Sequence, residues 1–535
     1  MPDLPVRPGA GAQPRVRFGR ASGGAALGTA LSRVTGVVRT LSVVGALGLT
    51  ELRLADVYAV ANITPNILYE LLLGGILTSV FVPLFVDLAR ARGEDEAWEG
   101  ASAVAGCALL ALVSLAVAGV LLAPWIYRLY SIGDPADAAA QAAGTALVRW
   151  VMPQVVFYGT AALAGGLLNA HDRFAVSSFA PVASNLAVSA VFASYYLLFT
   201  SADVEAVSGA ALAWIGAGTT LGVLLQAVAH LPSLHRVSRG RLRPRVRFRD
   251  PAVARLVRLS GGVLGYVAVN QAGYLVVTNF AYAACQGCKA AYDTAFVFFQ
   301  LPHGLIAVSI STVLLPRLAR AAADGDERTF RHRLRHGTRL TLTGMLPAAA
   351  GLALLAPAVS EIALVGTGSA ASAELLGEIL ALFCLGLVPF SLYQLLIRGF
   401  YARQDTRSPL LVNVAAVAVN VAADVALYPS LGVHGLAIGY AAAYLCACAL
   451  ALVVMRRRVG GLDLAALGPP LFRIAAATAV MAAAVLAIAL PTRDWAGFGP
   501  RLGRVLLEAG AGLLLYGLVA WRLGLLHLDV DDTPV

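Results

Sequence analysis

Long apolar runs separated by short polar breaks dominate this sequence. Each run of about 20 residues can cross the hydrocarbon core of a bilayer as one helix. The pattern therefore predicts an all-α polytopic membrane protein with about fourteen transmembrane helices, and an even number places both chain ends on the same side. The predicted helices are centred near residues 36, 72, 112, 155, 187, 218, 270, 305, 348, 387, 418, 445, 480 and 513.

Two sequence matches between the halves of the chain indicate an internal repeat. The segment TSVFVP (78–83) resembles STVLLP (311–316), and LNAHD (168–172) resembles FYARQD (400–405). Both pairs are offset by about the same number of residues, equivalent to six predicted helices. Because an even shift preserves helix orientation, we expect two six-helix lobes related as parallel repeats, with a site between them.

The repeat divides the chain into six parts. We expect a disordered cytoplasmic lead, an N-lobe, a basic cytoplasmic linker, a C-lobe, two further transmembrane helices and a cytoplasmic tail. These parts cover residues 1–22, 23–232, 233–252, 253–459, 460–525 and 526–535.

The distribution of basic residues among the loops supports this topology. The chain has 535 residues, is 59% hydrophobic and 13% charged, and carries a formal net charge of +10. Most of the basic residues fall in alternate loops, which the positive-inside rule places in the cytoplasm together with both chain ends. This distribution indicates contact with anionic membrane lipids and gives no support for nucleic-acid binding. The longest basic segment, 235–250, is predicted to be a lipid-facing linker between the lobes.

Charged residues inside the first two predicted helices are the main functional signal. A charge at the bilayer centre costs about 3 kcal/mol on insertion scales, so such residues usually face a bundle interior or a wet cavity. Arg33 and Arg39 would lie about 120° apart around one helix and about 9 Å apart along it, on one cavity wall. The alternative for Arg33 is that its side chain extends to the inner membrane surface.

The second predicted helix combines helix-bending residues with an acid. Pro65–Asn66 and Gly74–Gly75 can free backbone groups and allow bending, in a structural or a gating role. Glu70 needs a partner in the membrane, and Arg39 or Arg33 is the nearest candidate. The pair would be a structural ion pair, a gate or both.

Two later helices carry further polar groups. Gln300 and His303 interrupt an apolar face, and His303 is either a hydrogen-bonded structural histidine or a proton carrier. Asn420 and Asp424 are four residues apart and share a helix face. They would begin a cation site or be satisfied by neighbouring helices.

Cysteine usage and motif content are less informative. Cys285 and Cys288 form CQGC at a helix end on the predicted outer side, as either a disulfide or idle thiols. A second pair that would complete a zinc site is absent from the sequence. No sequence motif of an enzyme active site is present either, so we expect a protein that is not an enzyme.

The sequence resembles the MviN/MurJ family of lipid II flippases, within the multidrug/oligosaccharidyl-lipid/polysaccharide exporter superfamily. The matching segments are SRVTGVVR (32–39), ADVYAVANITPNILYELLLGGILTSVFVP (55–83), FQLPHGLIAVSISTVLLPRLAR (299–320) and RGFYARQDTRSPLLVNVAAVAVN (398–420). Abundant alanine and arginine with a single lysine indicate an actinobacterial-type member.

The resemblance implies a bacterial cytoplasmic-membrane protein that moves undecaprenyl-pyrophosphate-linked disaccharide-pentapeptide, or lipid II, from the inner to the outer leaflet by alternating access. Cell-wall synthesis proteins are the implied partners. Two alternatives remain open: a flippase for another polyprenyl-linked glycan, and a non-transporting scaffold for cell-wall synthesis.

The resemblance also assigns residues. The expected substrate-binding residues are Arg33, Arg39, Asn66, Tyr69, Glu70, Gln300, His303 and Arg398. The expected gating or orienting residues are Asp56, Pro65, Gly74 and Gly75.

Three departures from the family pattern accompany these assignments. Tyr69 and Val297 stand where the family has arginines, and Arg398 would compensate. The family's sodium site maps onto Asn420 and Asp424, but a family aspartate is replaced by Val277. We expect no cofactor, and either a sodium ion or a proton as the coupling ion.

Overall fold

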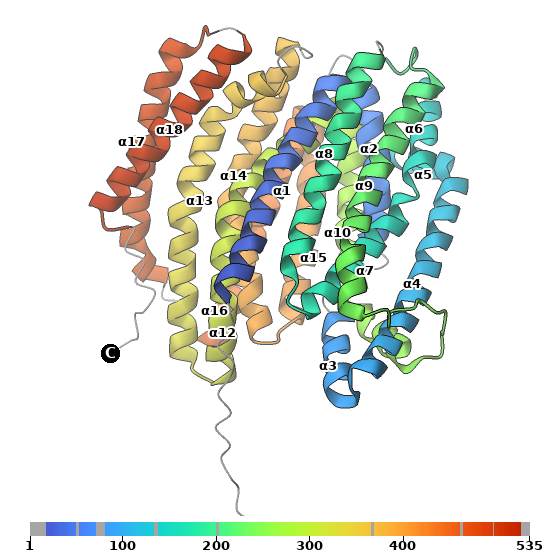
Figure 1. The fold of residues 1–535 in the computed structure, drawn as a ribbon. Helices are drawn as coiled ribbons and strands as arrows, with labels where there is room; N and C mark the ends of the chain where they lie inside the picture. The colour runs from blue at the N-terminus through green and yellow to red at the C-terminus, as the bar shows by residue number, and fades with distance from the viewer. Residues whose placement is uncertain are drawn as a thin grey trace, which may run out of the picture.

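The computed structural model describes residues 18–49, 53–70, 81–132, 137–199, 203–364, 369–460, 464–495 and 497–525. These residues form a bundle of long helices that run roughly side by side, with no strands among them (Figure 1). The first half of the chain contributes α1 (Phe18–Leu47), α2 (Leu54–Tyr69), α3 (Val82–Arg92), α4 (Glu94–Leu121), α5 (Ala123–Tyr130), α6 (Ala138–Val151), α7 (Gln154–Ala170), α8 (Phe174–Leu198) and α9 (Gly209–Ser238). The second half contributes α10 (Pro251–Ala284), α11 (Cys288–Pro302), the π-helical turn η3 (His303–Ala307), α12 (Val308–Ala323), α13 (Glu327–Ala363), α14 (Ala370–Ala402), α15 (Arg407–Leu431), α16 (Val433–Val459), the short 3-10 helix η4 (Leu464–Leu467), α17 (Gly468–Thr492) and α18 (Phe498–Arg522).

The described helices confirm the prediction of an all-α polytopic membrane protein. Twelve of the described helical segments are long and apolar enough to cross a membrane. Each contains or adjoins one of the predicted centres. The two remaining centres fall near residue 270, inside the 34-residue helix α10, and near residue 72, just beyond the end of α2. Residues 71–80, which include Gly74 and Gly75, lie outside the described residues.

Helix packing is equivalent in the two halves. In the N-lobe, α1 packs on α8, α8 on α9, α7 on α9 and α4 on α7. In the C-lobe, α10 packs on α15, α15 on α16, α14 on α16 and α13 on α14. The same pairing therefore occurs twice in the same chain order. Helices α17 and α18 pack on each other and on α13, at one edge of the bundle (Figure 1).

One turn shows the repeat at the level of individual hydrogen bonds. The Arg173 N–H donates to the Leu168 carbonyl at 2.9 Å, and the Asp405 N–H donates to the Phe400 carbonyl at 3.0 Å. In both turns the preceding residue has a left-handed backbone, with φ of 59° at Asp172 and 58° at Gln404. The structure therefore pairs Asp172 with Gln404, at the same offset that relates Ala170 to Ala402 in the sequence match.

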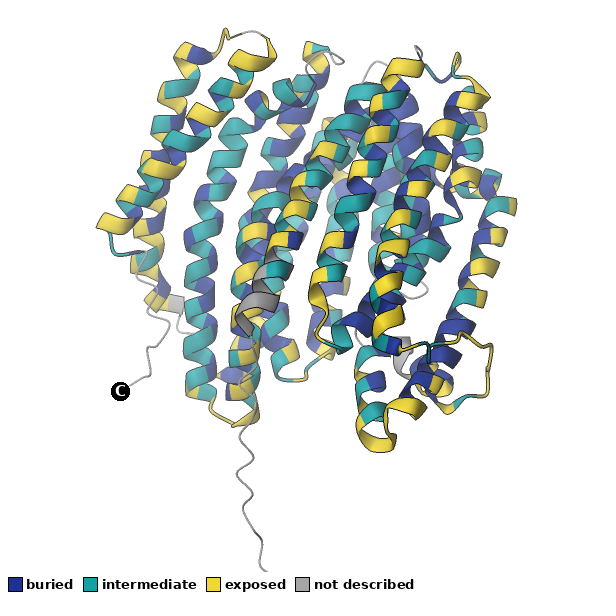
Figure 2. Cartoon of the chain, in the orientation of Figure 1, coloured by how far each residue is buried: buried dark blue, intermediate teal, exposed yellow. Residues whose placement is uncertain are grey.

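Burial separates an interior from a lipid-facing surface. Buried residues line the inside of each lobe, while exposed positions lie on the outer faces of the helices (Figure 2). Many of the exposed residues are large and apolar, including Leu197, Phe472, Leu513 and Leu514. An apolar outer surface of this extent fits hydrocarbon rather than water as the surrounding solvent.

A polar cavity between the lobes as the candidate functional site

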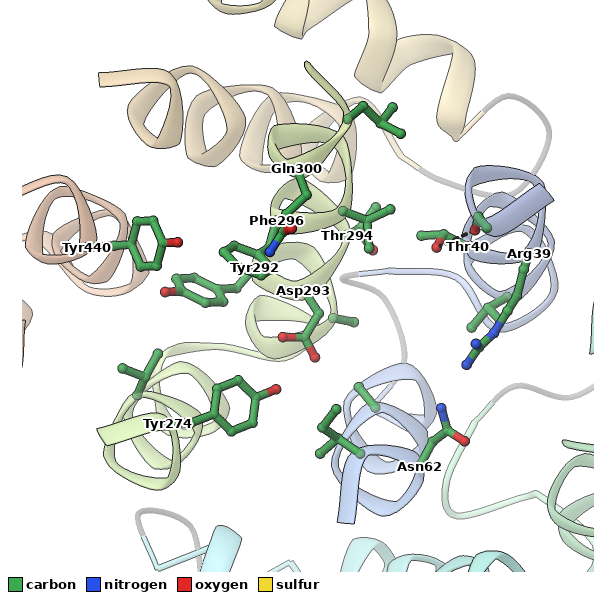
Figure 3. Close-up of a pocket in the computed structure, with 18 of the residues that line it drawn as sticks. Arg39, Thr40, Asn62, Tyr274, Tyr292, Asp293, Thr294, Phe296, Gln300 and Tyr440 are labelled. Atoms are coloured by element: carbon green, nitrogen blue, oxygen red, sulfur yellow. Dashed lines mark hydrogen bonds between the residues drawn. The ribbon is translucent and has the colours of Figure 1, made fainter. Parts of the chain in front are cut away.

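The candidate site is a cavity of about 860 Å³ lined by helices of both lobes. Helices α1, α2, α7, α8 and α9 contribute the N-lobe wall, and α10, α11, α15 and α16 contribute the C-lobe wall. In the close-up, Arg39 and Asn62 lie on the N-lobe side of the space between the lobes, and Tyr274 and Asp293 lie on the C-lobe side (Figure 3). This is the location that the internal repeat predicts.

Two arginines on α1 supply the positive charge of the cavity. Arg33 and Arg39 both line it, and neither forms an ion pair with a described residue. Arg33 packs against Gly304, where an added Cβ would lie 3.2 Å from the Arg33 Nε. Arg39 reaches the hydroxyl group of the buried Tyr58. Both guanidinium groups therefore keep donors free for an anionic ligand.

A polar contact between α1 and α8 fixes the helix that carries these arginines. The Asn185 Nδ2 donates to the Ser32 carbonyl at 3.1 Å and to the Thr35 Oγ1 at 3.2 Å. On the same face of α1, Gly28 packs against α8 so closely that an added Cβ would lie 2.8 Å from the Ser178 Cβ. These contacts hold α1 against α8 and orient Arg33 and Arg39 toward the cavity.

Neutral polar side chains make up much of the remaining wall. Amides suit sugar hydroxyls and peptide groups because each carries two donors and one acceptor oxygen, and tyrosines add a ring face and a hydroxyl. The amides are Asn62, Asn185, Gln226, Asn270, Gln271, Gln300, Asn413 and Asn420, and the tyrosines are Tyr58, Tyr158, Tyr274, Tyr292, Tyr440 and Tyr444. Of these residues, the sequence analysis assigned only Gln300 and Asn420.

One acidic residue of the cavity wall is neutralised by a buried lysine. Asp293 on α11 lines the cavity and forms an ion pair with Lys289, whose side chain is 1% exposed. The Lys289 Nζ also donates to the Tyr274 hydroxyl at 3.1 Å. Lys289 lies in the first turn of α11 and is buried in the junction of the lobes. Its spacing of four residues from Asp293 on one helix was the available signal.

A set of contacts between the lobes closes the end of the cavity near Cys285 and Cys288. The Asp56 carboxylate on α2 accepts hydrogen bonds from the Gly287 N–H at 2.7 Å and the Ala290 N–H at 2.8 Å. These N–H groups belong to the first turn of α11, so an N-lobe carboxylate caps a C-lobe helix. Asp56 is fully buried.

Further contacts strengthen the same junction. The Tyr127 and Tyr282 hydroxyl groups are 2.8 Å apart, and the Arg53 guanidinium lies 4.1 Å from the centre of the Tyr282 ring. The Asn279 Nδ2 donates to the Leu129 carbonyl at 2.9 Å. We call this group, with Asp56 and the start of α11, the latch.

The CQGC segment lies directly beside the latch. Cys285 and Cys288 are joined by a disulfide, with Cα atoms 5.2 Å apart. Gly287, between them, has a left-handed backbone with φ of 78°, which glycine adopts without steric cost. The disulfide and the glycine together shape the turn that presents two N–H groups to Asp56.

Five expected substrate-binding residues do not line this cavity. The His303 ring is buried, its Nδ1 lies 3.0 Å from the Ser391 Oγ, and it packs 4.6 Å from the Phe390 ring. This environment is that of a structural histidine. Arg398 lies near His303 but is not part of the cavity wall.

The other three are on α2 or at its end. Asn66 lies outside the cavity wall, and the Tyr69 ring packs 6.0 Å from the Tyr158 ring. The expected partnership of Glu70 with Arg33 or Arg39 is wrong, because Glu70 forms no ion pair with any described residue. Pro65 is a buried residue within α2, which continues through it to Tyr69.

Asn420 and Asp424 meet on one face of α15, as expected. The Asn420 Nδ2 lies 3.2 Å from each Asp424 carboxylate oxygen, and Asp424 is fully buried beside Gly439. The pair offers one carboxylate and, with the amide turned, one carbonyl oxygen, which are ligand types that suit a hard cation. Within the described residues, no group of three His, Cys, Asp or Glu side chains is placed to hold a metal ion.

The fold and the cavity together define the class of protein to which this chain belongs. Two equivalent lobes packed around a polar central cavity, in a bundle of membrane-spanning helices, are the architecture of an alternating-access transporter.

Comparisons with known proteins narrow the class. A family model described as lipid II flippase MurJ matches residues 46–498. A probable lipid II flippase MurJ of Rhizobium meliloti (strain 1021) is 33% identical over 517 residues, covering 94% of this chain and 92% of the relative. The lipid II flippase MurJ of Burkholderia cenocepacia is 30% identical over 414 residues, covering 76% of this chain and 78% of the relative.

A solved structure of lipid II flippase MurJ in an inward closed conformation has the same fold. Its TM-score is 0.75 at 18% identity, covering 93% of this chain and 98% of the solved chain. The chain belongs to the lipid II flippase MurJ family.

Proposed function

We propose that this protein is a lipid II flippase. It moves the undecaprenyl-pyrophosphate-linked disaccharide-pentapeptide across the bacterial inner membrane by alternating access of the cavity between its lobes. The observation that carries this proposal is the pair of cavity arginines without carboxylate partners, Arg33 and Arg39, within the family defined above.

The cavity chemistry matches each part of such a head group. A pyrophosphate needs several N–H donors and positive charge away from lipid, and guanidinium groups give charge-assisted contacts that can be bidentate. The amides and tyrosine hydroxyls of the wall can contact the sugar and peptide portions. The polyprenyl tail stays in the hydrocarbon while the head moves through the cavity.

The latch determines which end of the cavity is closed in this conformation. Because Asp56 joins α2 to the first turn of α11, the cavity is closed at the Cys285–Cys288 end in this conformation. We assign that end to the outer face, since the basic loops cluster at the opposite end and both chain termini would then be cytoplasmic. Breaking the latch would expose the head group to the outer face.

We further propose that Asn420 and Asp424 couple transport to a cation gradient. Their contribution is one carboxylate and one amide, and either Na⁺ or a proton would neutralise Asp424. The family pattern favours Na⁺, while the replacement of a family aspartate by Val277 leaves one ligand fewer on this chain.

Arg39→Ala is the direct test. In vesicles containing purified protein and fluorescent lipid II, we expect flipping to fall at least tenfold, because a charge-assisted contact contributes about 1.5–3 kcal/mol. The matched control is Arg149→Ala, which removes an exposed arginine from α6 without touching the cavity. A normal flipping rate for folded Arg39→Ala would refute the assignment.

The vesicle assay, together with growth and depletion experiments, separates the alternatives. A flippase for another polyprenyl-linked glycan would move that lipid and leave lipid II in place. A non-transporting scaffold would support growth when both Arg33 and Arg39 are replaced by alanine. Accumulation of lipid II in the inner leaflet after depletion of this protein is the outcome that the proposal requires.

A further inference from the structure

The linker between the lobes carries a dense group of arginines that the transport proposal does not use. Residues 239–249, here called the arginine segment, read RGRLRPRVRFR. The segment joins α9 to α10 at the end of the bundle away from Cys285, because α10 runs from Pro251 to Ala284 between the two. It crosses the end of α4 as a non-helical stretch (Figure 1).

The arginine segment is docked on α4 through its backbone. The Arg243 N–H donates to the Ser102 Oγ at 3.0 Å, and the Arg245 N–H donates to the Ser102 carbonyl at 3.0 Å. Gly106 lies beneath Arg245, and an added Cβ there would come within 2.3 Å of the Arg245 backbone. The absence of a side chain at Gly106 is what allows this close approach.

Docking of the backbone leaves most of the guanidinium groups available. Arg241 is held by Glu94 at 2.9 Å and by Asp95 at 3.3 Å. Arg239, Arg243, Arg245 and Arg247 form no ion pair with a described residue. All four line a hollow of about 350 Å³ together with Glu99, Ser102, Ala103, Gly240 and Arg241. The hollow thus has a strong excess of positive charge over a polar floor.

Exposed apolar side chains alternate with these arginines. Val246 is 50% exposed and Phe248 is 66% exposed, each between two arginines. Exposure of a phenylalanine side chain to water is unfavourable. A membrane interface accommodates both the apolar and the basic side chains of the segment, with the apolar groups among the acyl chains and the arginines at the phosphates. The segment also directly follows the end of the membrane-spanning helix α9 and packs on the first half of the membrane-spanning helix α4.

We propose that the arginine segment and α4 form a binding site for the head group of an anionic phospholipid. The lipid phosphate occupies the hollow and is contacted by Arg243, Arg245 and Arg247, while Val246 and Phe248 enter the adjacent leaflet. The site is separate from the cavity between the lobes, so its occupant is a membrane lipid and not the transported molecule.

Native mass spectrometry of the full-length protein in detergent tests the proposal, with phosphatidylglycerol and phosphatidylcholine as the lipids. We expect preferential retention of phosphatidylglycerol. Replacing Arg243, Arg245 and Arg247 together by glutamine should weaken that binding roughly fivefold per arginine, or about a hundredfold. The matched control replaces the exposed Arg456, Arg457 and Arg458 by glutamine as well, which removes the same charge from the end of α16.

Gly106→Leu separates a built site from simple charge attraction. It keeps every arginine but displaces the segment from α4, so we expect it to lose the preference for phosphatidylglycerol as well. Equal weakening in the Arg456–Arg458 control would overturn the proposal, as would full binding by the glutamine variant. Displacement of the lipid by millimolar inorganic phosphate would show a soluble-anion site instead. If Gly106→Leu does not fold, the glutamine variant alone tests the proposal. Unchanged thermal unfolding of that variant would exclude misfolding as the cause of its weaker lipid binding.

Discussion

The latch makes a quantitative prediction about the conformational equilibrium. Asp56→Ala removes the acceptor of two backbone N–H groups at the start of α11, which are held at 2.7 and 2.8 Å in the closed form. Once the latch opens, water can satisfy both the carboxylate and these N–H groups, so the substitution destabilises the closed form selectively. Hydrogen bonds to a charged group contribute about 1.5–3 kcal/mol each.

The expected shift follows from these values. The other contacts of the latch remain in the variant: the hydroxyl contact between Tyr127 and Tyr282, the Arg53–Tyr282 contact and the Asn279 contacts. We therefore take the lower value for each of the two lost hydrogen bonds, which gives a net loss of about 3 kcal/mol. This loss corresponds to roughly a 150-fold shift toward opening at the Cys285–Cys288 end. Asp56→Asn keeps one acceptor oxygen, and we expect about a tenfold shift on the same scale. The predicted order of opening is therefore alanine, asparagine, then the natural aspartate.

Labelling of a cavity cysteine measures this opening. Thr40 lines the cavity, and Thr40→Cys can be placed in a background in which the free cysteines Cys107, Cys384, Cys446 and Cys448 are replaced. A membrane-impermeant maleimide added at the outer face should label the Asp56→Ala protein much faster than the parent.

Glu374→Gln is the matched control for the latch, because it removes an exposed carboxylate from the same end of the bundle without an ion pair to break. We expect this variant to label at the parental rate. Unchanged labelling of Asp56→Ala would refute the latch as the element that holds the cavity closed.

Three further predictions concern other ionised groups. Lys289→Met leaves Asp293 unpaired at the cavity wall, so lipid II flipping should fall about tenfold, as for the loss of one charge-assisted contact, and adding Asp293→Asn should restore much of it. Asp424→Asn should abolish any dependence of flipping on a sodium or proton gradient, measured in vesicles with each gradient imposed alone. Burial alone would raise the pKa of Asp405, but hydrogen bonds from Ser408 and Arg407 and the nearby Arg458 lower it below its ordinary value. Because the folded-state pKa is lowered, the stabilisation is present at neutral pH and lost as pH falls through that pKa; Asp405→Ala should cost about 1 kcal/mol of unfolding free energy at pH 7 and little in acid, measured by thermal unfolding.

Sequence alone determined the architecture because the bilayer leaves few choices. A long apolar run must form a helix that satisfies its own backbone, so twelve of the predicted centres coincide with described membrane-spanning helices. Arg33 and Arg39 were identified for the same reason, since a charge in an apolar run requires a polar neighbour. The internal repeat was also visible, because the turn at Leu168–Arg173 and its equivalent at Phe400–Asp405 leave similar sequence letters.

The partners of these groups could not be predicted in the same way. Glu70 was assigned to Arg33 or Arg39 by proximity along the chain, yet helix rotation decides which faces meet and no such ion pair forms. Lys289 sits next to a predicted loop but is buried, because the start of α11 lies within the junction of the lobes. The amides of the cavity wall carry no distinguishing signal, since asparagine and glutamine in membrane helices also serve helix packing.

The charge balance of the cavity explains how this chain can work with fewer arginines than the family pattern. Asp293 and Lys289 cancel, which leaves the two unpaired charges of Arg33 and Arg39 at the wall. A pyrophosphate diester carries about two negative charges, so its complex with this cavity is close to neutral. Crossing a low-dielectric region is costly for any uncompensated charge, of either sign. A further arginine at the position of Val297, which lines the cavity, would hold the head group more tightly without improving that balance, and the neutral amides can provide the remaining contacts.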